Sequence, residues 1–434
     1  MRAWDAVGGP SRLSAGGRDA PVTRPDRSLI ATIAVLASLL AAATPAAAAP
    51  GDWWQFGYTA ANTRFNPNET TIGPANVGRL GLAAQQQPPG YEQASAVAVA
   101  NGRAYVQVGN YESGGDALLA YDVGSFWAPA LWQQEAGCGS PSPTVHLGIV
   151  FVGSVACRPS GDDGGVRAVD GATGELLWYS QLLGIGEGEE DASNVAATSG
   201  AVYFSMYANA VYGGDNALVS LDARTGGLRW KVDGIVGGSP AVAGGRVFVG
   251  TMTGQLQARS AATGALLWAR AGGSLSGAPA VTGGVVYSLG TENGASRLFA
   301  RRADTGALVW KQPLPGQLNW SWPAVAGGRV LAATSAGISA LDAATGTLRW
   351  RVNVAGASSP AVANGLVYAG LTSGVGAWRL SDGVRRWRWG TITYGAPVVS
   401  GGRLYVSAVT PDVDHPVVVV DQFELAAAAA GAIS

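Results

Sequence analysis

Short runs in which apolar and polar residues alternate recur along most of the chain, and glycine-rich turns separate neighbouring runs. Ser239–Gly250, with the sequence Ser-Pro-Ala-Val-Ala-Gly-Gly-Arg-Val-Phe-Val-Gly, is typical. A period of two predicts β-strands, and Gly-Gly or Asn-Gly between two such runs predicts a tight hairpin. Comparable segments begin at eight places: Ser95, Ser142, Ser193, Ser239, Ala278, Trp322, Ser359 and Ala396.

A second repeated segment lies downstream of these hairpins. It reads Asp-x-x-Thr-Gly-x-Leu-x-Trp in Asp170–Trp178, Asp222–Trp230 and Asp342–Trp350. The Thr-Gly pair supplies the positive-φ residue that closes a second short hairpin, so each unit has four strands. Such a unit cannot bury both faces of its sheet alone, and we expect its terminal tryptophan to pack against the next unit. These structural tryptophans are Trp132, Trp178, Trp230, Trp268, Trp310, Trp350 and Trp387.

Stacking of the units around an axis predicts an all-β fold, an eight-bladed β-propeller of four-stranded antiparallel blades. The last unit begins at Ala396 and ends without an outer strand. We expect Val77–Ala83 to supply that strand beside Val417–Val420, with Leu82 in the place of the tryptophan. The ring would then close on its own N-terminus, and residues 50–425 would form one domain.

The first 49 residues have the pattern of an extension followed by an export signal. Arg24 and Arg27 precede the apolar run Leu29–Ala43, and small residues follow up to Ala49. The run is shorter than the roughly 20 residues of a membrane span, so we expect cleavage after Ala48 and release outside the cytoplasm, either secreted or in the cell envelope. The Ala-rich tail, residues 426–434, carries neither charge nor pattern.

The charges and the cysteines narrow the possible partners. Lys and Arg number 28 and Asp and Glu 29, which excludes the strongly basic surface of a nucleic-acid-binding protein. The only cysteines are Cys138 and Cys157. After export we expect them to form a disulfide across a loop of about 20 residues, which would contribute roughly 3 kcal/mol to stability. Two free buried thiols are the alternative.

The outer hairpin matches the pattern Ala-x-Asp-x-x-Thr-Gly-x-x-x-Trp and resembles the repeat of the pyrroloquinoline-quinone (PQQ) propeller family. Asp52–Pro67 is similar to the opening of quinoprotein alcohol and glucose dehydrogenases. The resemblance implies one of two functions, because the family contains PQQ- and calcium-dependent dehydrogenases as well as scaffolds such as an outer-membrane assembly lipoprotein. The adjacent cysteine pair that the dehydrogenases commonly carry is absent.

In a propeller, the loops between an outer strand and the next inner strand gather at one mouth of the central channel, where ligands commonly bind. Aromatic residues in or next to these loops are candidates to stack on a planar ligand, although packing of the channel is an alternative explanation for them. They are Tyr91, Trp320, Trp322 and Tyr394.

An acidic loop offers candidate ligands for a hard cation such as calcium. Its members are Glu187, Glu189, Glu190 and Asp191. A solvated loop without metal is the preferred explanation, because no known calcium-loop pattern frames these carboxylates.

The sequence therefore predicts an exported, monomeric propeller that binds a protein partner or a small ligand, without an identifiable catalytic constellation. The two histidines, His146 and His415, lie in different units, and neither a hydrolase triad nor a zinc site follows from them. A PQQ-dependent alcohol or sugar dehydrogenase is the alternative.

Overall fold

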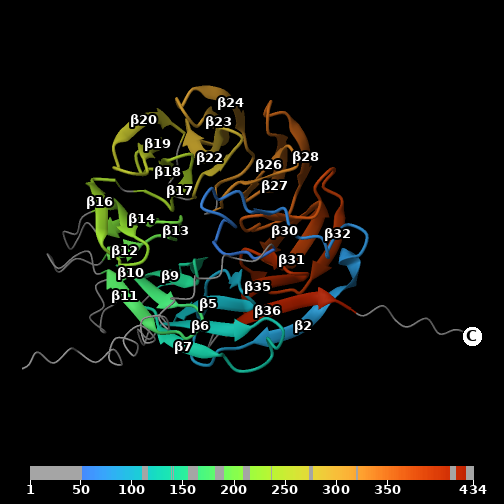
Figure 1. Cartoon of the computed structure of the whole chain (residues 1–434). Helices are drawn as coiled ribbons and strands as arrows, with labels where there is room; N and C mark the ends of the chain where they lie inside the picture. Colours follow the sequence, from blue (N-terminus) through green and yellow to red (C-terminus); the bar gives the residue numbers. More distant parts are fainter. Residues whose placement is uncertain are drawn as a thin grey trace, which may run out of the picture. The chain divides into compact units, whose positions relative to one another are not determined.

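The computed structural model describes residues 51–109, 116–137, 139, 141–154, 165–180, 190–208, 216–235, 237–272, 277–318, 321–410 and 417–426. Of residues 190, 191, 207 and 208 it describes the backbone only. All of these residues belong to the unit Ala46–Ser434. The strands of this unit follow one another in sequence order around a central axis (Figure 1).

Most strands form sets of four, each paired antiparallel from the axis outward. The innermost strands are β4 (Ala98–Ala100), β8 (Thr144–His146), β13 (Ala196–Ala197), β17 (Ala241–Ala243), β21 (Ala280–Thr282), β25 (Ala324–Ala326), β29 (Ala361–Ala363) and β34 (Val398–Ser400). The second strands are β5 (Arg103–Gly109), β9 (Ile149–Ser154), β14 (Ala201–Ala208), β18 (Arg246–Gly250), β22 (Val285–Glu292), β26 (Arg329–Thr334), β30 (Leu366–Leu371) and β35 (Arg403–Val409).

The third strands are β6 (Ala117–Asp122), β10 (Gly165–Asp170), β15 (Ala217–Asp222), β19 (Gln255–Ser260), β23 (Ala295–Arg302), β27 (Gly337–Asp342), β31 (Gly374–Arg379) and β36 (Val418–Leu425). The outer strands are β7 (Trp132–Glu135), β11 (Leu176–Ser180), β16 (Leu228–Asp233), β20 (Leu266–Ala271), β24 (Leu308–Pro313), β28 (Leu348–Val352), β32 (Arg385–Trp389) and β2 (Leu80–Gln86). Four short strands and a 3-10 turn complete the described elements: β1 (Phe65–Asn66), β3 (Gln93–Ala94), β12 (Glu190–Ala192), β33 (Thr393–Tyr394) and η1 (Val77–Arg79).

The predicted all-β fold of four-stranded antiparallel sheets is confirmed. Hydrogen bonding among the described residues nevertheless gives seven sheets rather than eight. The strand β33 pairs with both β31 and β35 and thereby joins the last two sets into one ten-stranded sheet. The count of eight blades therefore stays an interpretation of the four-strand sets.

An N-terminal strand completes the last set, as expected. The strand β2 pairs antiparallel with β36, with Leu80 opposite Leu425 and Gln86 opposite Val420 (Figure 1). The predicted bounds were wrong at both ends, because Val77–Arg79 forms the 3-10 turn η1 and the strand continues to Gln86 instead of ending at Ala83. The side chain of Asn76 accepts a hydrogen bond from the Gly73 amide and thus stabilises the turn before the strand begins.

The register of β2 corrects one residue assignment. In the second set, Trp178 lies opposite Ala168, and a bulge follows. In the closing pair the same place relative to the bulge is occupied by Ala84, opposite Gln422. Leu82, predicted at the tryptophan position, instead corresponds to the exposed leucine that begins most of the other outer strands, and it is 40% exposed.

In the units that carry it, the aspartate of the repeat holds the turn before the outer strand. Oδ1 of Asp170 accepts hydrogen bonds from the amides of Ala172 and Thr173 and from the Thr173 hydroxyl. The Gly174 amide donates to the Asp170 carbonyl, and Gly174 has a φ of 78°. Asp222 and Asp342 repeat the same pattern with their own turns. The Asp-x-x-Thr-Gly motif therefore encodes a turn, not a site.

Each of the seven structural tryptophans joins its set to the next one in the ring. The indole of Trp230 packs on the turn glycine of the following set, so that a Cβ added at Gly264 would lie 2.8 Å from the ring. Its Nε1 donates to the carbonyl of Ala261, also in the following set. The donor–acceptor pairs are Trp132–Gly171, Trp178–Ala223, Trp230–Ala261, Trp268–Ala303, Trp310–Ala343, Trp350–Leu380 and Trp387–Leu80.

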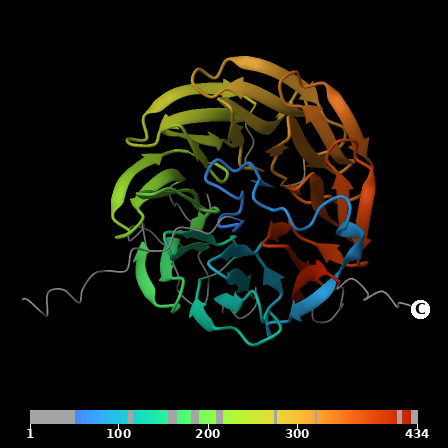
Figure 2. The ribbon, with the colours of Figure 1, turned by 45° about the vertical axis from the view of Figure 1, so that its right-hand side comes forward.

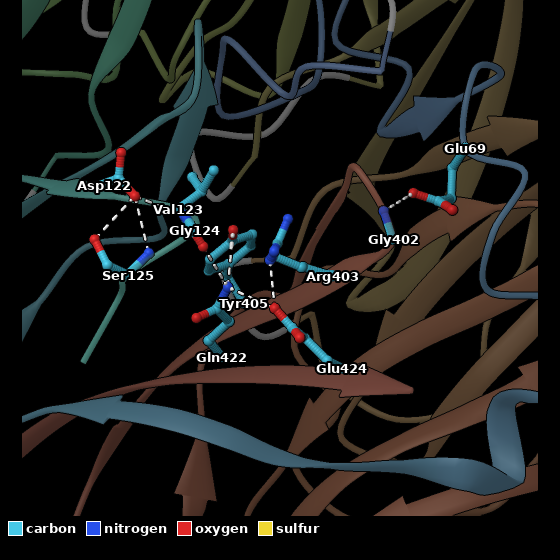
Figure 3. Close-up of polar contacts among 10 residues, drawn as sticks. All are labelled: Glu69, Asp122, Val123, Gly124, Ser125, Gly402, Arg403, Tyr405, Gln422 and Glu424. Carbon is cyan, nitrogen blue, oxygen red and sulfur yellow. Dashed lines mark hydrogen bonds and ion pairs between the residues drawn. The ribbon is translucent and has the colours of Figure 1, made fainter. Parts of the chain in front are cut away.

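At the closing interface, between the last set and the first, different residues make the equivalent contact. Because Ala84 has no indole, Nε2 of Gln422 donates instead to the carbonyl of Val123, at 3.0 Å (Figure 3). Val123 directly follows β6, just as most of the other acceptors directly follow a third strand. Phe126, 1% exposed, packs edge-on against Tyr405 at 5.6 Å. The ring that packs on Tyr405 of the last set thus comes from Phe126 of the first set.

Candidate site in the central channel

The N-terminal segment, residues 53–66, passes along the innermost strands and occupies the centre of the ring (Figure 2). One residue in each innermost strand bonds to it in turn. The pairs, inner strand first, are Val99–Trp53, Val145–Trp54, Ala197–Gln55, Val242–Ala60, Val281–Ala61, Val325–Thr63, Val362–Arg64 and Val399–Asn66. Most of these bonds join backbone groups, whereas Gln55 and Asn66 use their side-chain amides.

Arg64 is fully buried within this segment. Its Nε donates to the carbonyl of Pro360 at 2.8 Å and its Nη1 to that of Phe56 at 2.9 Å, and Nη2 makes longer bonds to the carbonyls of Ser359 and Pro397. The guanidinium also lies 4.6 Å from the centre of the Phe56 ring. Burial lowers the pKa of Arg64 to about 9, so the group stays charged at neutral pH. Carbonyl dipoles and the ring face stabilise that charge.

Trp322 closes the channel against the same segment. The centre of its ring lies 3.8 Å from that of Phe56, and its amide donates to the Ser359 hydroxyl at 3.0 Å. It is 8% exposed, the same fraction as the structural tryptophan Trp230. Trp322 is therefore packed like a core residue on the described side of the channel.

Asn194 links three successive sets beside this packing. Its Oδ1 accepts from the Ser142 amide at 2.6 Å, and its Nδ2 donates to the Ser239 hydroxyl at 3.1 Å. Asn194 and Ser239, together with Phe56 and Trp322, border a cavity of about 10 Å³. That volume holds about one water molecule, so no small organic ligand fits between Phe56 and Trp322.

The other predicted aromatic residues lie in different surroundings. Tyr394 is buried and donates its hydroxyl to Asp421 at 3.0 Å. Tyr91 is partly exposed, and its hydroxyl accepts from Gln133. Among the described residues no ring contact joins Tyr91, Trp322 and Tyr394, and Trp320 lies outside the described residues.

Asp421 is a buried carboxylate that the sequence did not single out. It is 1% exposed, and besides Tyr394 it receives a hydrogen bond from Nε2 of Gln85 at 2.6 Å. Burial raises the pKa of this carboxyl, and the two hydrogen bonds oppose the shift only in part. The signal in the sequence was weak: a single aspartate in the apolar run Val417–Phe423.

Neither the predicted metal loop nor the predicted disulfide falls on described side chains. Glu187 and Glu189 lie outside the described residues, and Glu190 and Asp191 are described only as backbone of β12. Elsewhere in the described ranges there is no cluster of three or more His, Cys, Asp or Glu side chains suited to a metal. The cysteine pair also lies outside these ranges, so both predictions remain open.

Comparison with known proteins agrees with this geometry. Residues 214–301 and 275–422 match the family model described as outer membrane protein assembly factor BamB. The chain is a PQQ-like β-propeller. The repeat resemblance and the propeller fold inferred from the sequence are thus both confirmed.

Relatives of this propeller include both an outer membrane protein assembly factor and a dehydrogenase. BamB of Yersinia pestis is 28% identical over 51% of this chain and 60% of its own length. Quinoprotein ethanol dehydrogenase of Pseudomonas aeruginosa is 32% identical over 26% of this chain and 23% of its own length. The chain therefore spans less than two thirds of these curated relatives.

Solved structures extend the likeness of the fold to nearly the whole propeller. The crystal structure of quinohemoprotein alcohol dehydrogenase from Comamonas testosteroni superposes with a TM-score of 0.71, at 16% identity, over 88% of this chain and 82% of that one. Within the described residues, no helix is long and apolar enough to cross a membrane.

The cavity between Phe56 and Trp322 is too small for a quinone cofactor. Small-molecule pockets have volumes of about 300–1,000 Å³, whereas the cavity between Phe56 and Trp322 measures about 10 Å³. A carboxylated ligand in the channel segment would need a cation as its partner, and the cation of that segment is Arg64. Its guanidinium already donates to four backbone carbonyls.

Proposed function

We propose that this PQQ-like propeller acts outside the cytoplasm as a scaffold that binds a partner protein, rather than as a dehydrogenase. The packed channel is the observation that carries the proposal. The segment around Arg64 lies along the innermost strands, and the contact between Phe56 and Trp322 leaves a cavity of only about 10 Å³ beside it. Binding then depends on the outer surfaces of the ring.

The comparisons support a scaffold without deciding between the two functions. The family model that matches residues 214–422 is described as an assembly factor. The BamB relative also matches a larger share of this chain than the dehydrogenase does, 51% against 26%. Export rests on the predicted signal within residues 1–49, and an assembly role would require it.

The alternative, a PQQ-dependent dehydrogenase, is tested directly. Purified protein is incubated with PQQ and calcium, desalted, and examined for a bound quinone spectrum and for dye reduction with alcohols and aldoses. A known quinoprotein dehydrogenase treated in the same way is the positive control. We expect neither signal from this protein.

A bound quinone together with dye reduction would overturn the scaffold proposal. The variant Trp322→Ala then shows where the quinone binds. Loss of the quinone spectrum in that variant, at a temperature where its circular dichroism shows that it is folded, would locate the cofactor beside Trp322, where a planar ligand was expected from the sequence.

A further inference from the structure

A groove with a cavity volume of about 550 Å³ lies between the fourth and fifth sets. It is formed by the turn between β17 and β18, the turn between β21 and β22, and the turn after β23. Val285 and Val309 contribute apolar surface, and Val309 is 46% exposed. Arg246 and Arg302 contribute positive charge. A side chain added at Gly284 would meet nothing within 4 Å, so the rim of the groove is open.

A second groove, of about 310 Å³, repeats this arrangement between the sixth and seventh sets. Arg329 begins β26 as Arg246 begins β18, and Arg379 ends β31 as Arg302 ends β23. Leu380, together with Pro74 from the N-terminal segment, supplies the apolar surface. Both grooves therefore have the same pair of arginines at the same two positions.

The arginine pair distinguishes these two interfaces from others in the ring. The interface between the fifth and sixth sets has Val285 and Asp342 at the two positions, and the one between the first and second sets has Arg103 and Asp170. Two like charges at one interface would repel, so a pair of arginines in an open groove favours an anionic ligand.

In each groove one arginine already has a carboxylate and the other does not. Arg302 pairs with Asp304 at 2.6 Å, and Arg379 pairs with Asp382. Nη1 of Arg246 donates only to the carbonyl of its own turn, at Gly244. Within the described ranges, the buried Nε atoms of Arg246 and Arg329 have no acceptor and neither side chain forms an ion pair. Each groove therefore retains one uncompensated positive charge.

Both grooves open on the same face of the ring. They are formed by turns between first and second strands and between third and fourth strands, and these turns lie at the same end of an antiparallel four-stranded sheet. Two equivalent sites on one face, two sets apart, suit an extended chain better than a single small molecule.

We propose that these two grooves bind an acidic segment of a partner protein. Each groove takes one carboxylate against its unpaired arginine, Arg246 or Arg329, and an adjacent aliphatic side chain against the apolar surface. This inference rests on the proposed function and specifies the chemistry of its partner. In the first groove, the open turn at Gly283 and Gly284 leaves room for the backbone of the bound segment.

The test uses the purified full chain and a fluorescein-labelled 12-residue peptide that alternates glutamate with leucine. Fluorescence anisotropy at low salt measures its affinity. The double variant Arg246→Gln/Arg329→Gln should bind at least fivefold more weakly, and Arg246→Lys/Arg329→Lys should retain most of the binding. Arg224→Gln/Arg351→Gln removes the same charge from exposed sites outside the grooves and should change affinity less than twofold. Thermal melting of each variant shows that it is folded.

Equal binding by all variants, or equal binding of a peptide that alternates glutamine with leucine, would overturn the proposal. Displacement of the peptide by glutarate beyond the effect of sodium chloride at equal ionic strength would assign the grooves to small carboxylates and also overturn it. The quinone assay on the same preparation distinguishes failure of the proposed function from failure of this inference. Quinone-dependent activity would refute the scaffold function. Charge-independent peptide binding without that activity would refute only the proposed binding of an acidic segment in the grooves.

Discussion

Two of the tryptophan interfaces differ by a single hydroxyl, which makes their hydrogen bonds separable by experiment. The carbonyl of Ala261 accepts from Nε1 of Trp230 at 3.0 Å and from the hydroxyl of Tyr203 at 3.2 Å. The carbonyl of Ala303 accepts from Nε1 of Trp268 at 3.1 Å, where Phe248 replaces the tyrosine and offers no donor.

The surroundings of the two tryptophans are otherwise matched. Trp230 is 8% exposed and Trp268 5%. Their rings lie 5.9 and 6.0 Å from the neighbouring aromatic ring, at interplanar angles of 47° and 51°. Each also packs on a turn glycine of the next set. Replacing either tryptophan with phenylalanine therefore removes similar apolar volume, and the difference between the two variants reports the hydrogen bond.

We expect Trp268→Phe to be more destabilising than Trp230→Phe. An acceptor that loses its only donor costs about 1–3 kcal/mol, and the partial exposure of Ala303 places the difference near the lower end, at about 1 kcal/mol. Urea unfolding followed by far-UV circular dichroism measures it, provided that the two variants share the same dependence on urea.

A double variant supplies the control. Tyr203→Phe combined with Trp230→Phe removes both donors to Ala261 and should raise the loss to that of Trp268→Phe. Equal losses for the two single variants would refute the reasoning, because the second donor would then be irrelevant. A larger loss for Trp230→Phe would show that packing outweighs the hydrogen bond.

Three further outcomes are expected. Trp322→Ala should lower the free energy of unfolding by about 3–5 kcal/mol in urea, because it opens a cavity against the channel segment; an unchanged midpoint would contradict this packing role. Because burial raises the pKa of Asp421, the folded state keeps that proton when the unfolded state has lost it, so stability should fall as pH rises above the ordinary value of 3.8. Urea unfolding between pH 4 and 8 should show that the stability of Asp421→Asn falls less with rising pH than that of the unmodified protein. Parallel curves of stability against pH for the two proteins would exclude a contribution from Asp421. Non-reducing peptide mapping of exported protein should find Cys138 linked to Cys157; recovery of two alkylatable thiols would rule the bond out.

Local sequence was sufficient for the repeated elements because their determinants are local. The alternation in Ser239–Gly250 gives strands and a tight turn, and the Asp-x-x-Thr-Gly motif binds its own backbone, as at Asp170. Pairing of the N-terminal strand with the end of the chain also followed from counting strands. The prediction that Leu82 takes the tryptophan position, made from the glycine-to-tryptophan spacing, was wrong. The bulge in β2 shifts the register and places Ala84 opposite Gln422.

The candidate site depended on contacts that spacing does not encode. Trp322 stood out in the sequence because other units carry small residues at that place, but its partner, Phe56, lies 266 positions away, and only the fold brings the two rings together. The carboxyl of Asp421 is buried for the same reason, since Gln85 and Tyr394 reach it from distant segments.

Short-range alternation and turn chemistry specify each unit independently of its neighbours, so the repeat, the four-strand unit and the N-terminal strand that closes the ring could be inferred from the chain alone. What fills the channel and where charge is left uncompensated depend on how the units pack together. Arg246 and Arg302 lie 56 positions apart, and the groove between them exists because successive sheets pack side by side. Such a property belongs to the interface between units, and no single repeat contains it.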